Sequence, residues 1–425
     1  MDHSSLAAIL LMLFSFSLIS KRTEGTVITA PILFTAAGFI ASKNYLGAVN
    51  INVNHHTIHT IAELTLILLL FADASRIKFK LLARQHNLAL RMLVIGLPLT
   101  ILFGTGIASA YFPQLSIWEA GLLAALLAPT DAALGQTVVT AKAVPLRIRQ
   151  TVNVESGLND GIALPVVLMM AALSAADDPS AGSGEWLSFA IHQIGLGPVA
   201  GIAVGWIGAK SLDRAIGNGW ASTPFEGVAT LSLAILSYVL AELIGGNGFI
   251  AAFVAGMTFG NTLKANPTFL LEFMESEGSL LMLLTFLVFG ATLLPEGLAL
   301  FKFEYLVFAL LSLTVIRMVP IAASLIGSGI RAPTYGFLGW FGPRGLASIL
   351  FLLLIIEEEK IVHREELFAI TVLTVGLSIL IHGITAAPLS NRYGRYLSAC
   401  PKSIENGDVV DMPLRQGNEQ HPVTK

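Results

Sequence analysis

Stretches of apolar residues, separated by short polar segments, run along almost the whole chain. A helix needs roughly 20 apolar residues to cross the hydrocarbon core of a bilayer, and these stretches are about that long. We therefore predict an all-α polytopic membrane protein with about 13 transmembrane helices. The predicted spans cover residues 4–20, 27–43, 57–76, 87–112, 117–141, 146–174, 186–209, 223–244, 247–262, 269–295, 303–328, 333–357 and 364–390.

The amino-acid composition agrees with this prediction. Hydrophobic residues make up 54% of the chain and charged residues only 12%, whereas soluble domains carry about 25% charged residues. The single cysteine, Cys400, excludes a disulfide within the chain and most cysteine metal sites. Neither an H-E-x-x-H nor a G-x-S-x-G motif is present, which argues against an intramembrane enzyme.

Basic residues gather in the connections on one side of the predicted spans. Lys142, Arg147 and Arg149 lie at one such connection. Because cytoplasmic loops are enriched in lysine and arginine, this bias predicts an N-terminus outside and a C-terminus in the cytoplasm. Residues 391–425 would form a short polar cytoplasmic tail, which we expect to be disordered or lightly structured because it lacks apolar periodicity.

Two of the predicted spans are interrupted in their middle. Residues 117–141 contain Pro129, Thr130 and Asp131, and residues 333–357 contain the sequence GPRG at 342–345. Proline removes a backbone donor and clashes with the preceding turn, and glycine tolerates the conformations that a break requires. If the span at 186–209 is set aside, the interrupted span is fifth in both remaining groups. This order predicts two inverted six-helix repeats whose interrupted helices cross in the core.

Several charged residues lie inside the apolar spans. A charge at the bilayer centre costs about 2.5–3.5 kcal/mol on insertion scales, so such residues face a protein interior or water and are candidates for function. They are Asp131, Glu155, Asp160, Arg317 and Arg344. Asp73 lies nearer the end of its span. There it would either line a cytoplasmic funnel or cap the helix end beside Arg76.

The span at 146–174 carries two neighbouring polar stripes. Residues four apart share a helix face, so Ser156 and Asp160 form one stripe, and Glu155 and Asn159 form the next. The first stripe offers a hydroxyl and a carboxylate, and the second a carboxylate and an amide. We expect the two stripes to have separate tasks.

Oxygen atoms from the interruption in residues 117–141 and from the neighbouring span at 146–174 could surround a cation. Asp131, Asp160, the Ser156 hydroxyl and the backbone or side chain of Thr130 would form an all-oxygen site, which suits a hard cation. The same carboxylates bind protons, and neighbouring acids titrate as a coupled pair. A site that holds either a cation or protons is the chemical basis of exchange.

The arginines within the spans need counter-charges. We expect either Arg317 or Arg344 to pair with Glu155, and a purely structural ion pair is the alternative role for that glutamate. Arg344 lies at a helix break, where a fixed positive charge can offset exposed carbonyl groups. His382 is interpreted as a packed or interface histidine rather than a proton carrier.

Three segments carry a resemblance to a known family. APTDAALGQTVV, ESGLNDGIALPVV and GWFGPRGLASI are similar to signature segments of the NhaP-type sodium/proton antiporters, in the monovalent cation:proton antiporter family. The resemblance implies a homodimer whose chain folds into thirteen helices in two inverted six-helix repeats, with a core and a dimerisation domain. The transmembrane domain would be residues 1–390, with core helices at about 87–174 and 303–390 and dimerisation helices in the remainder.

The resemblance also implies roles for residues. Asp160 would be the essential ion-binding aspartate, and Asn159 the amide typical of electroneutral members that exchange one sodium ion per proton. Asp131, Thr130 and Ser156 would complete the ion site, so that Na+ binds at Asp131, Ser156 and Asp160. Glu155 would orient Asn159 and pair with an arginine, Arg317 first and Arg344 second. The chain departs from many members at Asp131, which alanine rather than proline follows.

The sequence thus predicts a secondary antiporter that exchanges Na+ or Li+ for H+ across a prokaryotic inner membrane. K+/H+ exchange by the same architecture is the alternative, and a cation channel is a further class. We expect the partners to be the cation, protons, the lipid bilayer and a second copy of the chain. We expect no cofactor and no nucleic acid.

Overall fold

The computed structural model describes residues 3–23, 26–43, 45–47, 55–79, 82, 87–175, 183–264, 268–355, 361–400 and 402–407, and all regular elements in these ranges are helical. They are α1 (His3–Thr23), α2 (Ala30–Ala41), α3 (His55–Arg76), α5 (Asn87–Arg91), η1 (Met92–Gly96), α6 (Leu97–Tyr111), α7 (Ile117–Leu126), α8 (Ala132–Val139), α9 (Leu146–Ser174), α10 (Ser183–Gly217), α11 (Thr223–Leu243), α12 (Gly248–Thr262), α13 (Thr268–Val288), η2 (Phe289–Leu293), α14 (Leu294–Ala299), α15 (Phe303–Leu313), α16 (Val315–Ser324), α17 (Ala332–Trp340), α18 (Leu346–Ile355), α19 (Arg364–Ser398) and η3 (Ile404–Asn406).

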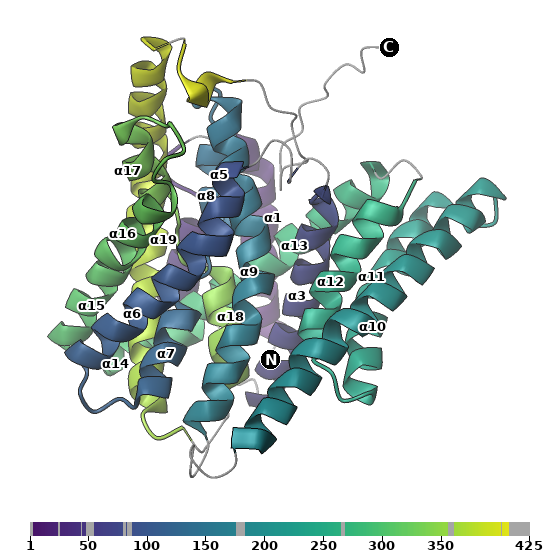
Figure 1. Cartoon of the computed structure of the whole chain (residues 1–425), viewed down its shortest axis with the longest axis horizontal. Helices are drawn as coiled ribbons and strands as arrows, with labels where there is room; N and C mark the ends of the chain where they lie inside the picture. Colours follow the sequence, from purple (N-terminus) through teal and green to yellow (C-terminus); the bar gives the residue numbers. More distant parts are fainter. Residues whose placement is uncertain are drawn as a thin grey trace.

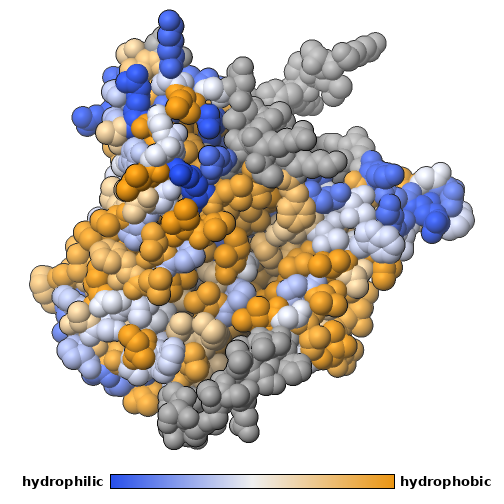
Figure 2. Space-filling view, viewed as in Figure 1, coloured by the Kyte–Doolittle hydropathy of each residue, from blue (hydrophilic) through white to orange (hydrophobic). Residues whose placement is uncertain are grey.

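The molecule is a membrane protein by the length and exterior of its helices. Eight helical segments of the described part are long and apolar enough to span a membrane. Figure 2 shows hydrophobic residues over the broad middle of one face and hydrophilic residues at its edges. The all-α prediction is confirmed for the described residues, while the count of about 13 spans and the inverted repeats stay predictions.

The helices form two packed groups on either side of a central pair. Figure 1 shows α10, α11 and α12 on one side and α6, α15, α16 and α17 on the other, with α9 and α18 between them. Contacts join α6 to α16 and α15 to α19 in one group, and α12 to α3, α10 and α11 in the other. The division into a core and a dimerisation domain stays a prediction.

Both predicted interruptions are present. α7 ends at Leu126 and α8 begins at Ala132, while α17 ends at Trp340 and α18 begins at Leu346. Two further irregularities were not predicted: the π-helical turns η1 and η2, each shortly before a proline, Pro98 and Pro295. A proline ring clashes with the carbonyl four residues earlier in an α-helix, and the wider π turn relieves that clash.

Small residues let α12 approach both of its neighbours closely. Gly256 and Gly260 face the backbone carbonyls of Phe71 and Ser75 in α3, and a Cβ on either glycine would overlap those oxygens. Glycines of α10 spaced four residues apart, Gly201 among them, pack in the same way on the other side of α12. Such small-residue contacts are typical of helix pairs in membranes, where van der Waals packing drives association.

The last helix continues beyond residue 390, the predicted end of the last span. α19 continues to Ser398 because Tyr393 and Leu397, four residues apart, extend its buried face. Beyond it, Glu405 in η3 is fully buried and accepts hydrogen bonds from the Arg331 N–H at 2.7 Å and the Thr334 hydroxyl at 2.8 Å. The segment thus docks on the start of α17, and residues 408–425 lie outside the described part.

Candidate functional site

The two interrupted helices meet at their breaks. The N–H of Asp131 donates to the carbonyl oxygen of Pro343 at 2.8 Å. The Arg344 guanidinium donates to the carbonyl oxygens of Ala128 and, at 3.2 Å, of Pro129. Backbone groups that a continuous helix would satisfy internally therefore bond across from one break to the other.

Asp131 caps two helices at once. Its Oδ1 accepts the N–H of Leu134 in the first turn of α8 at 3.2 Å, and its Oδ2 accepts the N–H of Leu346 at the start of α18 at 2.5 Å. A carboxylate is stabilised there because helix N-termini carry partial positive charge. Gly345 makes room for it, since a Cβ at that position would overlap Oδ2.

Arg344 offsets the negative end of the helix dipole at the C-terminus of α7, the first half of the first interrupted helix. Its side chain is fully buried and bonds carbonyl groups just beyond the C-terminus of α7, where the helix dipole is negative. The Ser348 hydroxyl donates to the Leu126 carbonyl oxygen, 2.7 Å away, at the same helix end. The predicted role of Arg344 as a fixed positive charge against exposed carbonyls agrees with this geometry.

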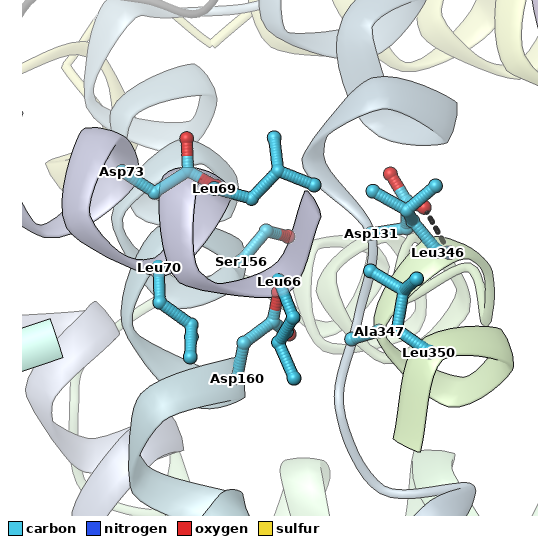
Figure 3. Close-up of a pocket in the computed structure, with 10 residues that line it drawn as sticks. All are labelled: Leu66, Leu69, Leu70, Asp73, Asp131, Ser156, Asp160, Leu346, Ala347 and Leu350. Atoms are coloured by element: carbon cyan, nitrogen blue, oxygen red, sulfur yellow. Dashed lines mark hydrogen bonds between the residues drawn. The ribbon is translucent and has the colours of Figure 1, made fainter. Parts of the chain in front are cut away.

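A pocket beside the breaks gathers three carboxylates and a hydroxyl. Asp73, Asp131, Ser156 and Asp160 line it together with Leu66, Leu69, Leu70, Leu346, Ala347 and Leu350. Figure 3 shows these side chains, which come from α3, the break between α7 and α8, α9 and α18. The pocket therefore combines the Ser156 and Asp160 stripe with Asp131, and it also contains Asp73, which the sequence associated only with a funnel or a helix cap.

The carboxylates of this pocket do not converge as a ready metal cluster. Among the described residues, no three His, Cys, Asp or Glu side chains are grouped so that they could hold a metal ion by themselves. Both oxygens of Asp131 already accept helix amides. Hydroxyl or backbone oxygens, such as the Ser156 hydroxyl, would have to complete any cation shell here.

Thr130 joins the two stripes of α9 rather than lining the pocket. Its Oγ1 lies 3.0 Å from the Ser156 Oγ and accepts the Asn159 Nδ2–H at 2.5 Å. All three side chains are buried. Glu155 was expected to orient Asn159, but the hydrogen bond that the structure gives the Asn159 amide runs to Thr130.

Glu155 pairs with Arg317. The Arg317 Nη2 donates to both carboxylate oxygens of Glu155 at 2.9 Å, and the two residues are 2% and 3% exposed. Of the two arginines considered, the structure thus places the preferred one against Glu155. Gly342 in the second break accommodates this pair, because a Cβ there would overlap the Arg317 guanidinium.

Two buried side chains of α19 also reach the second break. Ser378 bonds the backbone of the break at Arg344, and His382 bonds the carbonyl group of Trp340 at the end of α17. Sequence reasoning assigned neither residue to the site. Their spacing of four residues on one helix face was a signal, but serine and histidine inside a membrane helix have many structural uses. Only the path of α19 past the break shows what they contact.

The family model described as sodium/hydrogen exchanger, transmembrane, matches residues 7–392. The chain belongs to this family. The resemblance read from the three segments is therefore confirmed.

Individual relatives differ in the ion that their names give. The K(+)/H(+) antiporter NhaP of Alkalimonas amylolytica is 25% identical over 95% of this chain and 68% of its own length. The K(+)/H(+) antiporter NhaP2 of Shewanella baltica is 24% identical over 78% of this chain and 57% of its own. The Na(+)/H(+) antiporter NhaG of Bacillus atrophaeus is 26% identical over 70% of this chain and 58% of its own. The chain thus spans little more than half the length of most curated relatives it matches.

Solved structures show the same fold. The structure of the sodium proton antiporter MjNhaP1 from Methanocaldococcus jannaschii at pH 8 matches 92% of this chain and 98% of its own, with a TM-score of 0.77 and 20% identity. The proteins that this chain resembles are transporters, in agreement with the prediction that it is not an enzyme.

Proposed function

We propose that this protein is an antiporter that exchanges a monovalent cation for protons at the pocket of Asp160, Ser156, Asp73 and Asp131. The observation that carries the proposal is the collection of these side chains in one pocket beside two helix breaks that bond each other. Broken helices that meet within a membrane supply oxygen ligands and half-helix ends to a transported ion.

Within this pocket, Asp160 and Asp131 have different tasks. Each oxygen of Asp131 accepts a helix amide, so protonating either one would take a cap from α8 or α18. We therefore assign cation and proton exchange to Asp160, with the Ser156 hydroxyl as a neutral ligand. Asp131 contributes a fixed charge, and Asp73 from α3 contributes a third carboxylate to the wall.

Asn159 supports a simple stoichiometry. It stands next to Asp160 on α9 and bonds Thr130 through its amide, which carries no exchangeable charge. With an amide at position 159, Asp160 is the one ionisable group of the two neighbours, and it can release one proton for one cation. Electroneutral exchange is accordingly the stoichiometry that we propose.

The transported cation is proposed to be Na+, with Li+ as the other small ion. K+/H+ exchange is the second candidate, because relatives carry names of both kinds. The protein would work as a homodimer in a prokaryotic inner membrane, with its N-terminus outside and its C-terminus in the cytoplasm. The core helices would move against the remaining helices in the manner of an elevator.

The test is proton movement into vesicles that contain the purified full chain. Na+, Li+ or K+ is added across a range of pH, and the dequenching of a pH-sensitive dye is followed. We expect Asp160→Asn to abolish cation-driven proton movement in folded protein. Asp213→Asn, at the far end of α10 where Asp213 accepts the Lys264 N–H, should leave it unchanged. Retained exchange in Asp160→Asn would overturn the proposal.

A further inference from the structure

The second break, residues 341–345, is held by two side chains of α19. The Ser378 Oγ accepts the N–H of Arg344 at 2.7 Å. One turn further along α19, the His382 Nε2 lies 3.1 Å from the carbonyl oxygen of Trp340, the last residue of α17. Ser378 and His382 are 0% and 1% exposed. α19 therefore holds the chain both within the break, at Arg344, and at the residue just before it, Trp340.

In this contact each hydrogen-bond donor meets an acceptor, so the hydrogen bonds form one continuous series. A carbonyl oxygen only accepts, so the His382 Nε2 carries the proton that it donates to Trp340. The Nδ1 of a neutral ring then accepts, and the Ser378 hydroxyl, 3.1 Å away, can donate to it. The carbonyl of Ser378, also 3.1 Å from Nδ1, offers no proton. Three hydrogen bonds thus run from the Arg344 N–H through Ser378 and His382 to the Trp340 carbonyl.

The segment held in this way sets the geometry of the pocket. Its Pro343 carbonyl accepts the Asp131 N–H, and the N–H of Leu346, just after it, donates to the Asp131 carboxylate. The Arg344 side chain bonds carbonyl groups of the first break just beyond the end of α7. A shift of this segment therefore moves Asp131, Leu346 and the half-helix ends together.

We infer that Ser378 and His382 are positioning residues of the exchange site, which act by fixing the second break against α19. Neither lines the pocket, so neither is assigned a contact with the ion. The inference rests on the proposed function, because its consequence is a change in cation affinity.

Single substitutions can test each of these three hydrogen bonds separately. Ser378→Ala removes the acceptor of Arg344, and His382→Leu removes both ring contacts. His382→Gln keeps a donor near the position of Nε2, whereas His382→Asn keeps an acceptor near that of Nδ1. Thr374→Ala is the matched control, because that buried hydroxyl donates to the Ile370 carbonyl within its own helix.

The measurement is the apparent KM for Na+ and K+ in vesicles that contain equal amounts of folded protein. Because an unmet buried hydrogen-bonding group is costly, we expect Ser378→Ala and His382→Leu to raise the KM roughly tenfold. His382→Gln and His382→Asn should raise the KM less, and Thr374→Ala should not change it. Ser378→Ala and His382→Leu should leave the maximal rate within about twofold of wild type.

Other outcomes distinguish failure of the positioning role from failure of the proposed antiport function. A lower yield of folded protein with an unchanged KM would mean that the pair is merely structural, and would overturn the inference. The same conclusion would follow if Thr374→Ala matched Ser378→Ala, or if both conservative His382 variants matched the leucine variant. A wild-type protein without cation-driven proton movement would instead refute the proposed function.

Discussion

The buried pair of Glu155 and Arg317 offers a quantitative test of the packing around the breaks. The Arg317 Nη2 lies 2.9 Å from both oxygens of Glu155, and the two side chains are 2% and 4% exposed. Glu155→Gln removes the negative charge and leaves the guanidinium buried beside a neutral amide. Breaking a buried pair from one side typically costs about 3–5 kcal/mol of folding free energy. We expect a loss of that size.

Two control variants show whether the cost of Glu155→Gln in folding free energy comes from the lone buried charge. Glu366 bonds Lys302 at 3.2 Å in a pair that is 20% and 53% exposed, so Glu366→Gln should cost only about 0–1 kcal/mol. Replacing both buried partners, with Glu155→Leu and Arg317→Met, should restore most of the loss, because no lone charge stays buried. Unfolding in mixed micelles with increasing denaturing detergent measures each variant. A Glu155→Gln cost no larger than that of Glu366→Gln, or a double variant as unstable as the single one, would refute this reasoning.

Three further predictions concern the pocket and the docked C-terminal segment. Gly345→Ala places a Cβ on the Asp131 carboxylate, so we expect loss of exchange in folded protein, measured in vesicles. Asp73→Asn leaves an oxygen in the pocket wall but removes a charge, and should raise the apparent KM for the cation roughly tenfold without abolishing exchange. Burial raises the pKa of Glu405, but hydrogen bonds from the Arg331 N–H and from Thr334 outweigh it and hold the pKa below 4.5. The docking contact is then fully stabilising above about pH 4.5 and is lost as the pH falls through the lowered pKa. Limited proteolysis near Glu405 should therefore accelerate in wild type as the pH falls through that pKa, whereas Glu405→Gln should show no such pH dependence.

Local sequence predicted the features that local chemistry determines. Pro129 and the GPRG segment at 342–345 marked both breaks, because proline and glycine act on the backbone where they stand. The charges within apolar spans marked Asp160 and Asp131, because a membrane interior makes any charge costly. Helical periodicity grouped Ser156 with Asp160, and both line the pocket.

Features that depend on how distant helices pack were harder to predict. Asp73 reaches the pocket because α3 packs beside α9 and α18, which its own sequence does not reveal. The double cap by Asp131 requires the start of α18, which is more than 200 residues away in the chain. The role of Thr130 as an ion ligand stays a prediction, and the contacts of its hydroxyl with Ser156 and Asn159 could not be predicted from the sequence.

The segment after α19 shows a second limit of sequence reasoning. Residues 402–407 are mostly polar, yet Glu405 is buried, and two donors at the start of α17 bond its Oε1. A buried carboxylate in a polar segment can be recognised only once its partners are known.

The claim that one pocket holds either a cation or a proton is tested most directly by the pH dependence of the apparent KM for the cation in vesicles with wild-type protein. Competition for a shared site predicts that the KM rises by about tenfold per pH unit on the acidic side, while saturating cation restores the same maximal rate. A KM that does not change with pH, together with a maximal rate that falls as the pH is lowered, would contradict a shared site at Asp160.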